Sequence, residues 1–175
     1  MNKKDTVVFD LDGTLLDTLE DLKNSVNYAM TQCGYPEHTL DEVRRYVGNG
    51  ILLLMQRAIP GGKDDPNFDK AFTLFKEHYG KHCNDTTKSY AGIMELLHTL
   101  KENNIKIAIV SNKADFAVKE LNAIYFKDLI PVAIGEKESE GIRKKPAPDT
   151  VIEALKQLGS TAENSVYIGD SDVDI

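Results

Sequence analysis

Short apolar runs alternate with amphipathic stretches along this chain, and the two patterns predict strands and helices. The first apolar run predicts a strand over residues 6–10. Apolar residues at helical spacing then predict four helices in succession. The first begins at an N-cap, Thr18, with an acid three residues on, and the second begins at a capping box headed by Thr39. The other two cover residues 51–58 and 68–79.

After about residue 85 the pattern changes to an alternation of helices and strands. The helices are predicted near 93–100, 116–124 and 151–158, and the strands near 105–110, 131–134 and 166–168. Such alternation indicates an α/β fold, a Rossmann-like parallel sheet with helices on both faces. Residues 1–16 and 86–175 are therefore expected to form one α/β domain, with residues 17–85 inserted as an all-helical domain.

The most informative segment follows the first strand and reads Asp10-Leu11-Asp12-Gly13-Thr14. Side chains alternate along a strand, so the two carboxylates are expected to project to the same side. A nucleophilic carboxylate beside a second acid that shuttles a proton is what phosphoryl transfer through an aspartyl-phosphate requires. The alternative is an ordinary acidic turn, because Asp and Gly are common in turns.

Three later segments place polar groups at other predicted strand ends. Ser111 and Asn112 follow the strand at 105–110, and a hydroxyl with free backbone N–H groups can hold phosphoryl oxygens; an N-cap of the next helix is the alternative. Lys145 precedes a rigid Pro-x-Pro turn, which could aim it inward or leave it solvated. Asp170 and Asp174 end the last strand, where Mg²⁺ suits closely spaced acids and an acidic turn is again possible.

Composition narrows the classes of function. The chain has 175 residues, 41% of them hydrophobic, and a net charge of −7, so a broad nucleic-acid surface is not expected. No stretch approaches the roughly 18 apolar residues of a membrane span, and the first residues lack the apolar region of a signal peptide. Two cysteines outside any motif are expected to be free thiols in a reducing cytoplasm.

Together these motifs resemble those of the haloacid dehalogenase superfamily of phosphohydrolases with a helical cap inserted after the first strand. All four motifs occur in order: Asp10-x-Asp12-Gly-Thr, Ser111, Lys145, and Gly169-Asp170 with Asp174. Within the predicted cap, residues 43–50 are similar to the cap segment of phosphoglycolate phosphatases, as are Tyr90-x-Gly92 and Ser111-Asn112-Lys113. The resemblance implies that the chain lacks the last strand and helices of that fold, because it ends directly after the fourth motif.

The resemblance also implies catalytic roles. Asp10 would attack phosphorus and carry the aspartyl-phosphate, while Asp12 would protonate the leaving alkoxide and then deprotonate water. Mg²⁺ would be held by Asp10, the backbone carbonyl of Asp12, and Asp170. Ser111 would hydrogen-bond a phosphoryl oxygen, and Lys145 would neutralise charge on Asp10 and on the transferring group.

Further residues are assigned supporting or substrate-binding roles. Asn112 is expected to help bind the phosphoryl group, and Asp174 to orient Lys145 or the water shell of the metal. Thr14 supports the first motif. Arg44 could meet a substrate carboxylate, with a solvated helix face as the alternative. Gly48 and Gly50 are expected to give the cap freedom to move near its mouth.

The predicted function is a Mg²⁺-dependent phosphatase that hydrolyses a small phosphate monoester, with 2-phosphoglycolate as the first candidate. The alternatives are a pyrophosphatase, a sugar-phosphate phosphatase or a β-phosphoglucomutase of the same superfamily, or a catalytically inert module that binds phosphate. The second acid, Asp12, favours a phosphate ester over a haloacid, because dehalogenation has no leaving alkoxide to protonate. The expected partner is a small phosphorylated metabolite, with neither nucleic acid nor membrane, and the chain is expected to be a monomer or a homodimer.

Overall fold

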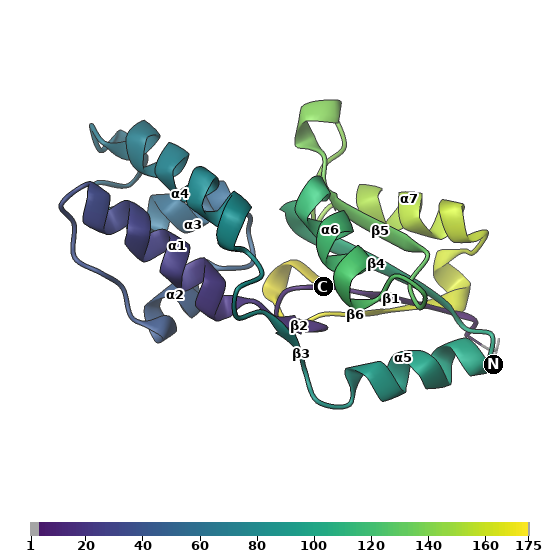
Figure 1. Cartoon of the computed structure of the whole chain (residues 1–175). Helices are drawn as coiled ribbons and strands as arrows, with labels where there is room; N and C mark the ends of the chain where they lie inside the picture. The colour runs from purple at the N-terminus through teal and green to yellow at the C-terminus, as the bar shows by residue number, and fades with distance from the viewer. Residues whose placement is uncertain (1–3, 175) are drawn as a thin grey trace. The chain divides into compact units, whose positions relative to one another are not determined.

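The computed structural model describes residues 4–174, which form two compact units (Figure 1). One unit contains the chain up to Leu16 and from Ser89 onward, and the other is Asp17–Lys88. The chain returns from the second unit to the first between residues 88 and 89, slightly later than the predicted boundary between residues 85 and 86. We call them the α/β unit and the helical unit.

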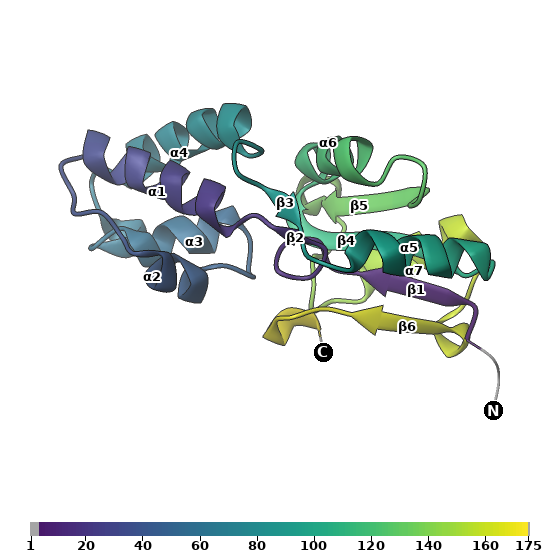
Figure 2. The same cartoon turned by 60° about the horizontal axis from the view of Figure 1, so that its bottom comes forward.

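The α/β unit is built on a four-stranded parallel sheet in the order β5-β4-β1-β6. The strands are β1 (Thr6–Phe9), β4 (Lys106–Ala114), β5 (Val132–Glu136) and β6 (Ser165–Ile168). Because β1 pairs with both β4 and β6, segments far apart in the sequence lie side by side at the centre of this unit (Figure 2). The predicted α/β class with a parallel sheet is confirmed.

Helices cover both faces of this sheet. α5 (Ile93–Glu102) and α6 (Asp115–Tyr125) share one apolar cluster with Phe9, while α7 (Asp149–Leu158) packs in a second cluster with Val8. Neighbouring residues of β1 thus point to opposite faces, as the period of a strand requires. The first cluster also contains buried Leu11, Leu97, Ile107, Ile109, Val118 and Leu121, and the second contains buried Ala108, Val110, Ile134, Ala154 and Leu155.

The helical unit has a core of its own. Its helices are α1 (Leu19–Gln32), α2 (Leu40–Tyr46), α3 (Ile51–Ala58) and α4 (Phe68–His82), close to the predicted ranges. The buried residues recur at helical spacing, as the sequence pattern indicated. They include Val26, Ala29, Met30, Val43, Leu54, Met55, Ala71 and Phe75.

The two predicted helix starts turn out differently. Thr39 forms its capping box: its Oγ1 accepts from Glu42 N–H at 3.3 Å, and Glu42 Oε2 accepts from Thr39 N–H at 2.7 Å. Thr18 occupies the N-cap position of α1, but its side chain makes no capping bond. The acid three residues on, Asp21, instead accepts hydrogen bonds from Thr86 and Thr87. The N-cap position predicted for Thr18 is therefore confirmed, while its side chain makes no capping bond and Asp21 has its partners after α4.

The remaining elements are short. β2 (Leu16–Asp17) and β3 (Lys88–Ser89) pair where the chain passes from one unit to the other. Single turns of 3₁₀ helix occur at Gly62–Asp64, Glu138–Glu140, Ala162–Asn164 and Asp172–Asp174. Within residues 4–174, no helix has both the length and the apolar character needed to cross a membrane.

Candidate active site

The candidate site lies at the carboxyl ends of the strands in the α/β unit. Asp10 directly follows β1, and its backbone N–H donates to Ile168 O at 2.9 Å, which extends the pairing of β1 with β6. Asp170 follows β6 by two residues, and Ser111 lies near the end of β4. Parallel strands bring all these ends to the same edge of the sheet, so the polar groups predicted at separate strand ends meet there.

Three carboxylates gather at this edge. Asp10, Asp170 and Asp174 each offer an oxygen, and these oxygens lie within 4.8 Å of one another. Thr14 donates from its hydroxyl to Asp170 Oδ1 at 3.1 Å. Gly13 permits the close approach: its φ is +83°, and a Cβ there would lie 2.2 Å from Asp170 Oδ2. Any side chain at position 13 would therefore displace one acid of the cluster.

Lys145 neutralises part of this charge. Its Nζ lies 3.0 Å from Asp10 Oδ2 and 2.6 Å from Asp174 Oδ1, and the lysine side chain is 3% exposed. Asn112 fixes the backbone of this lysine, because its Oδ1 accepts from Lys145 N–H at 2.9 Å and its Nδ2 donates to Lys145 O at 3.1 Å. Asn112 thus holds Lys145 in place, and its predicted part in binding the phosphoryl group stays a prediction.

Tyr167 is a member of the site that the sequence did not reveal. Its hydroxyl accepts from Lys145 Nζ at 2.9 Å and lies 3.1 Å from Asp174 Oδ1 and 3.0 Å from Val110 O. Burial, together with the nearby carboxylates of Asp10 and Asp174, raises the pKa of this phenol, so it remains protonated. The ammonium of Lys145 has three N–H groups, and Asp10, Asp174 and Tyr167 provide one acceptor for each.

Asp10 and Asp174 differ in their electrostatic surroundings. The pKa of Asp10 is raised to about 6: burial is the largest cause, the charges of Asp174 and Asp12 add to it, and Lys145 offsets only part of the rise. Burial acts in the same direction on Asp174, but hydrogen bonds from Lys145 and Ser171 outweigh it and lower the pKa of that carboxyl. The partners of Asp174 thus stabilise its charged form, whereas burial and the neighbouring acids disfavour the charged form of Asp10.

A second lysine meets the second acid of the first motif. Lys113 Nζ donates to Asp12 Oδ1 at 3.0 Å and Oδ2 at 3.3 Å. Ser111 lies inside β4 and not at the N-cap of α6, which is Ala114, so the capping alternative for Ser111 is wrong. The hydroxyl of Ser111 is buried and accepts from Lys113 N–H at 3.3 Å. The sequence showed Lys113 beside Ser111 but gave it no role.

The donor set fits a hard divalent cation. Three carboxylates share one small region where Lys145 supplies one positive charge. Carboxylate oxygens are the ligands that Mg²⁺ prefers. Of the predicted ligands, Asp10 and Asp170 belong to this group, joined by Asp174; the backbone carbonyl of Asp12 stays a prediction.

The predicted cap residues all lie in the helical unit. Arg44 is on α2, where it pairs with Asp41, and its side chain is 60% exposed. Gly48 and Gly50 have positive φ angles of 107° and 87° in the segment between α2 and α3. The contacts within this unit give Arg44 a surface ion pair, so the substrate roles of these three residues stay predictions.

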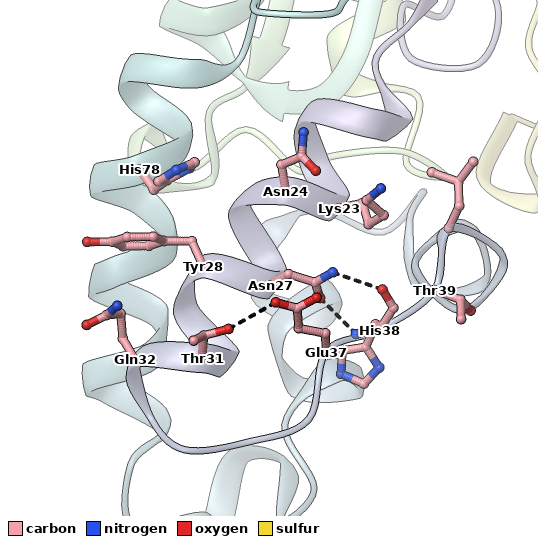
Figure 3. A pocket seen from close by; sticks show the side chains of 11 residues that line it. Lys23, Asn24, Asn27, Tyr28, Thr31, Gln32, Glu37, His38, Thr39 and His78 are labelled. Atoms are coloured by element: carbon pink, nitrogen blue, oxygen red, sulfur yellow. Dashed lines mark hydrogen bonds between the residues drawn. The ribbon is translucent and has the colours of Figure 1, made fainter.

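The helical unit also has a pocket of its own, about 550 Å³ in volume (Figure 3). Much of its wall is tied together internally. Asn27 Nδ2 donates to His38 O at 2.9 Å and its Oδ1 accepts from His38 N–H at 2.8 Å, while Thr31 donates to Glu37 at 3.3 Å. These bonds fasten the loop after α1 to that helix. The pocket is therefore explained by the folding of the helical unit and is not part of the acid cluster.

The fold and the strand-end residues together define a class of enzyme. Residues 7–175 match the family of haloacid dehalogenase-like hydrolases, and the chain belongs to that family.

Two curated relatives that are similar to this chain are phosphoglycolate phosphatases. A phosphoglycolate phosphatase of Aquifex aeolicus is 32% identical over 97% of this chain and 77% of its own length. A phosphoglycolate phosphatase of Pseudomonas putida is 31% identical over 97% of this chain, which spans only 63% of that relative.

Solved structures share the fold. A protein from Lactobacillus delbrueckii subsp. bulgaricus superposes with a TM-score of 0.88 at 34% identity, covering 98% of this chain and 80% of that one. A predicted phosphoglycolate phosphatase from Haemophilus somnus gives a TM-score of 0.88 at 27% identity, covering 100% of this chain and 80% of that one.

Proposed function

We propose that this protein is a Mg²⁺-dependent phosphatase that hydrolyses a small phosphate monoester, with 2-phosphoglycolate as its substrate, through an aspartyl-phosphate on Asp10. The observation that carries the proposal is the burial of Asp10 between Lys145 and two further acids, Asp170 and Asp174. Such a carboxylate has a fixed position and little water around it, which suits an oxygen that attacks phosphorus. The names of the relatives support the choice of substrate.

Each contact of Asp10 gives it a defined orientation. Oδ1 accepts from Leu11 N–H at 2.7 Å, and Oδ2 lies 3.0 Å from Lys145 Nζ. The ammonium balances negative charge as the phosphoryl group approaches, and Asp174 with Tyr167 keeps that ammonium in place. Ser111 contributes a buried hydroxyl at the end of the neighbouring strand, suited to a phosphoryl oxygen.

Asp12 is assigned the proton transfers. Its side chain is 17% exposed, more than that of Asp10, so it can meet the leaving oxygen and afterwards a water molecule. It would protonate the departing alkoxide and then remove a proton from the water that cleaves the acyl phosphate. Both steps use one carboxyl group, first as an acid and then as a base.

Asp10 and Asp170 would hold Mg²⁺, with the backbone carbonyl of Asp12 as a further ligand. When bound, the ion supplies positive charge that stabilises the negatively charged oxygens of the transferring group. The cytoplasm is the proposed location, since neither Cys33 nor Cys83 is in a disulfide.

Release of inorganic phosphate from 2-phosphoglycolate, with and without Mg²⁺, tests this proposal. Pyrophosphate and glucose phosphates at equal concentration serve as competing substrates. We expect Mg²⁺-dependent release that is highest for 2-phosphoglycolate and absent in Asp10→Asn. Higher activity on pyrophosphate or a sugar phosphate would reassign the substrate, and no release from any ester would make the chain a non-catalytic module.

A further inference from the structure

Lys113 is a buried cation that the reaction outlined above does not use. Its side chain is 3% exposed, and its Nζ contacts both carboxylate oxygens of Asp12. A lysine charge is costly to bury and is retained where anionic groups face it. Asp12 is one such group, and it is also the residue assigned to the leaving oxygen of the substrate.

The backbone around Lys113 is specifically arranged. The register of β4 against β5 shifts between Val110 and Ala114, which marks a bulge just before and at this lysine. Gly135 on β5 accommodates it, because a Cβ at that position would lie 2.6 Å from Lys113 O and 2.4 Å from the Cα of Asp115. Bulges next to active sites commonly redirect a side chain. Here the outcome is an ammonium directed at Asp12 from the adjacent strand.

The position of Lys113 defines which part of a substrate it would meet. An oxygen that accepts a proton from Asp12 must lie within hydrogen-bond distance of that carboxyl, about 3 Å. Since Lys113 Nζ is 3.0 Å from Asp12 Oδ1, the leaving oxygen lies within about 6 Å of the ammonium. In a 2-phosphoglycolate molecule, a single carbon separates that oxygen from the carboxylate, so the carboxylate belongs to the part of the substrate next to this charge.

We propose that Lys113 is a specificity-determining residue: it binds an anionic group on the alcohol half of the substrate and selects phosphate monoesters with a carboxylate next to the ester carbon. The inference rests on the proposed phosphatase function and adds the residue that recognises the alcohol half of the substrate. Lys145 holds the nucleophile and Lys113 holds the leaving alcohol, so the two buried lysines serve opposite ends of the bond that breaks.

The competing explanation is that Lys113 only positions Asp12. Removal of the lysine would then slow every substrate by the same factor, whatever its alcohol carries. The two explanations are separated by a ratio: kcat/KM for 2-phosphoglycolate divided by kcat/KM for ethylene glycol monophosphate, an ester of similar size with an uncharged alcohol. Misfolding or a misplaced Asp12 cancels in this ratio.

The experiment measures this ratio in the wild type, Lys113→Met and Lys113→Arg. Lys119→Met is the matched control, because Lys119 also pairs with an aspartate, Asp115, but is 59% exposed. We expect the wild type to prefer 2-phosphoglycolate, and the ratio to fall by about ten- to a hundredfold in Lys113→Met, as for loss of a charge-assisted contact. Lys113→Arg should restore most of the ratio, and Lys119→Met should leave it unchanged.

The outcomes distinguish this inference from the proposed function. An equal loss on both esters in Lys113→Met, or a wild type without preference for the carboxylate, overturns the role of Lys113 and leaves the phosphatase intact. A wild type that hydrolyses neither ester overturns the phosphatase, and the inference fails with it.

Discussion

Asp10 and Asp21 are both buried carboxylates, one in each compact unit, and their surroundings are opposite. Asp21 is 1% exposed and accepts from the N–H and hydroxyl groups of both Thr86 and Thr87, at 2.7 to 3.1 Å. Asp10 is 6% exposed and has one N–H, one ammonium and several acids around it. Burial raises the pKa of both groups, but the threonine bonds outweigh it at Asp21 and lower that pKa, whereas at Asp10 it rises to about 6.

This difference separates a structural acid from a reactive one. The carboxylate of Asp21 is saturated by neutral donors, so its charge ties α1 to the segment after α4 and has nothing left to offer a ligand. The carboxylate of Asp10 lies among other negative charges and is incompletely satisfied, which is the condition that a cation or a phosphoryl group relieves. Burial alone does not identify a catalytic carboxylate; the partners of the buried group do.

The largest expected effect is on activity, from Asp10→Asn. Loss of the attacking oxygen should reduce phosphate release by about a thousandfold or more. The melting temperature without Mg²⁺ should stay the same or rise, because a poorly compensated buried charge is removed. Enzyme assays and thermal unfolding on one preparation check both halves. Full activity in this variant would contradict the assignment of the nucleophile.

Asp21→Asn should lower the stability of the protein, in contrast to Asp10→Asn, which should lower its activity. The amide cannot accept all the bonds that the carboxylate accepts, and we expect the free energy of unfolding to fall by about 2–4 kcal/mol. Urea unfolding, followed by helical circular dichroism, measures this loss. Asp69→Asn is the matched control, because Asp69 is also in the first turn of a helix but is exposed. Equal stability of the two variants would show that the threonine bonds contribute nothing.

Tyr167→Phe should produce a smaller effect on activity. It removes the third acceptor of the Lys145 ammonium while Asp10 and Asp174 remain. We expect kcat to fall by about five- to twentyfold, in line with one lost hydrogen bond, with little change in KM. A change confined to KM would instead mean that the phenol contacts the substrate.

The pH dependence of stability should show the two carboxylates with opposite signs. The pKa of Asp21 is lowered, so its stabilisation is complete above its ordinary value of 3.8 and is lost as the pH falls through the folded pKa. The pKa of Asp10 is raised, so without Mg²⁺ its ionisation destabilises the fold as the pH rises from 3.8 to about 6. Measuring the free energy of unfolding of each Asp→Asn variant and of the wild type from pH 3 to pH 7 separates the contributions of the two carboxylates. If each variant had the same pH dependence as the wild type, the contrast between Asp10 and Asp21 would be contradicted.

The sequence predicted two kinds of feature: buried residues that recur at helical spacing, and polar residues that stand at the ends of strands. Helical spacing of Val26, Met30 and Phe75 predicted the core of the helical unit, because one buried face per helix forces that pattern. Asp10 and Asp170 each follow a predicted strand, and this predicted that their carboxylates lie close together, because parallel strands end at the same edge of the sheet.

What the sequence did not predict depends on partners far along the chain. In the sequence Asp21 was only an acid in the first turn of a predicted helix, and its partners, Thr86 and Thr87, lie 65 and 66 positions later. Tyr167 looked like an ordinary strand residue, since nothing local indicates that its hydroxyl reaches Lys145. Lys113 needed the bulge in β4 before its direction was defined. Side-chain direction and long-range pairing arise only in the folded chain.

The most direct test is to trap the phosphoryl group on the protein. In Asp12→Asn, p-nitrophenyl phosphate with Mg²⁺ should still transfer its phosphoryl group, because its leaving group needs no protonation, while hydrolysis of the acyl phosphate should slow. Acid quenching followed by peptide mass spectrometry locates the adduct. We predict a phosphorylated Asp10 that is missing from the double variant with Asp10→Asn. Phosphate release without any adduct, or an adduct on Asp170 or Asp174, would contradict the account.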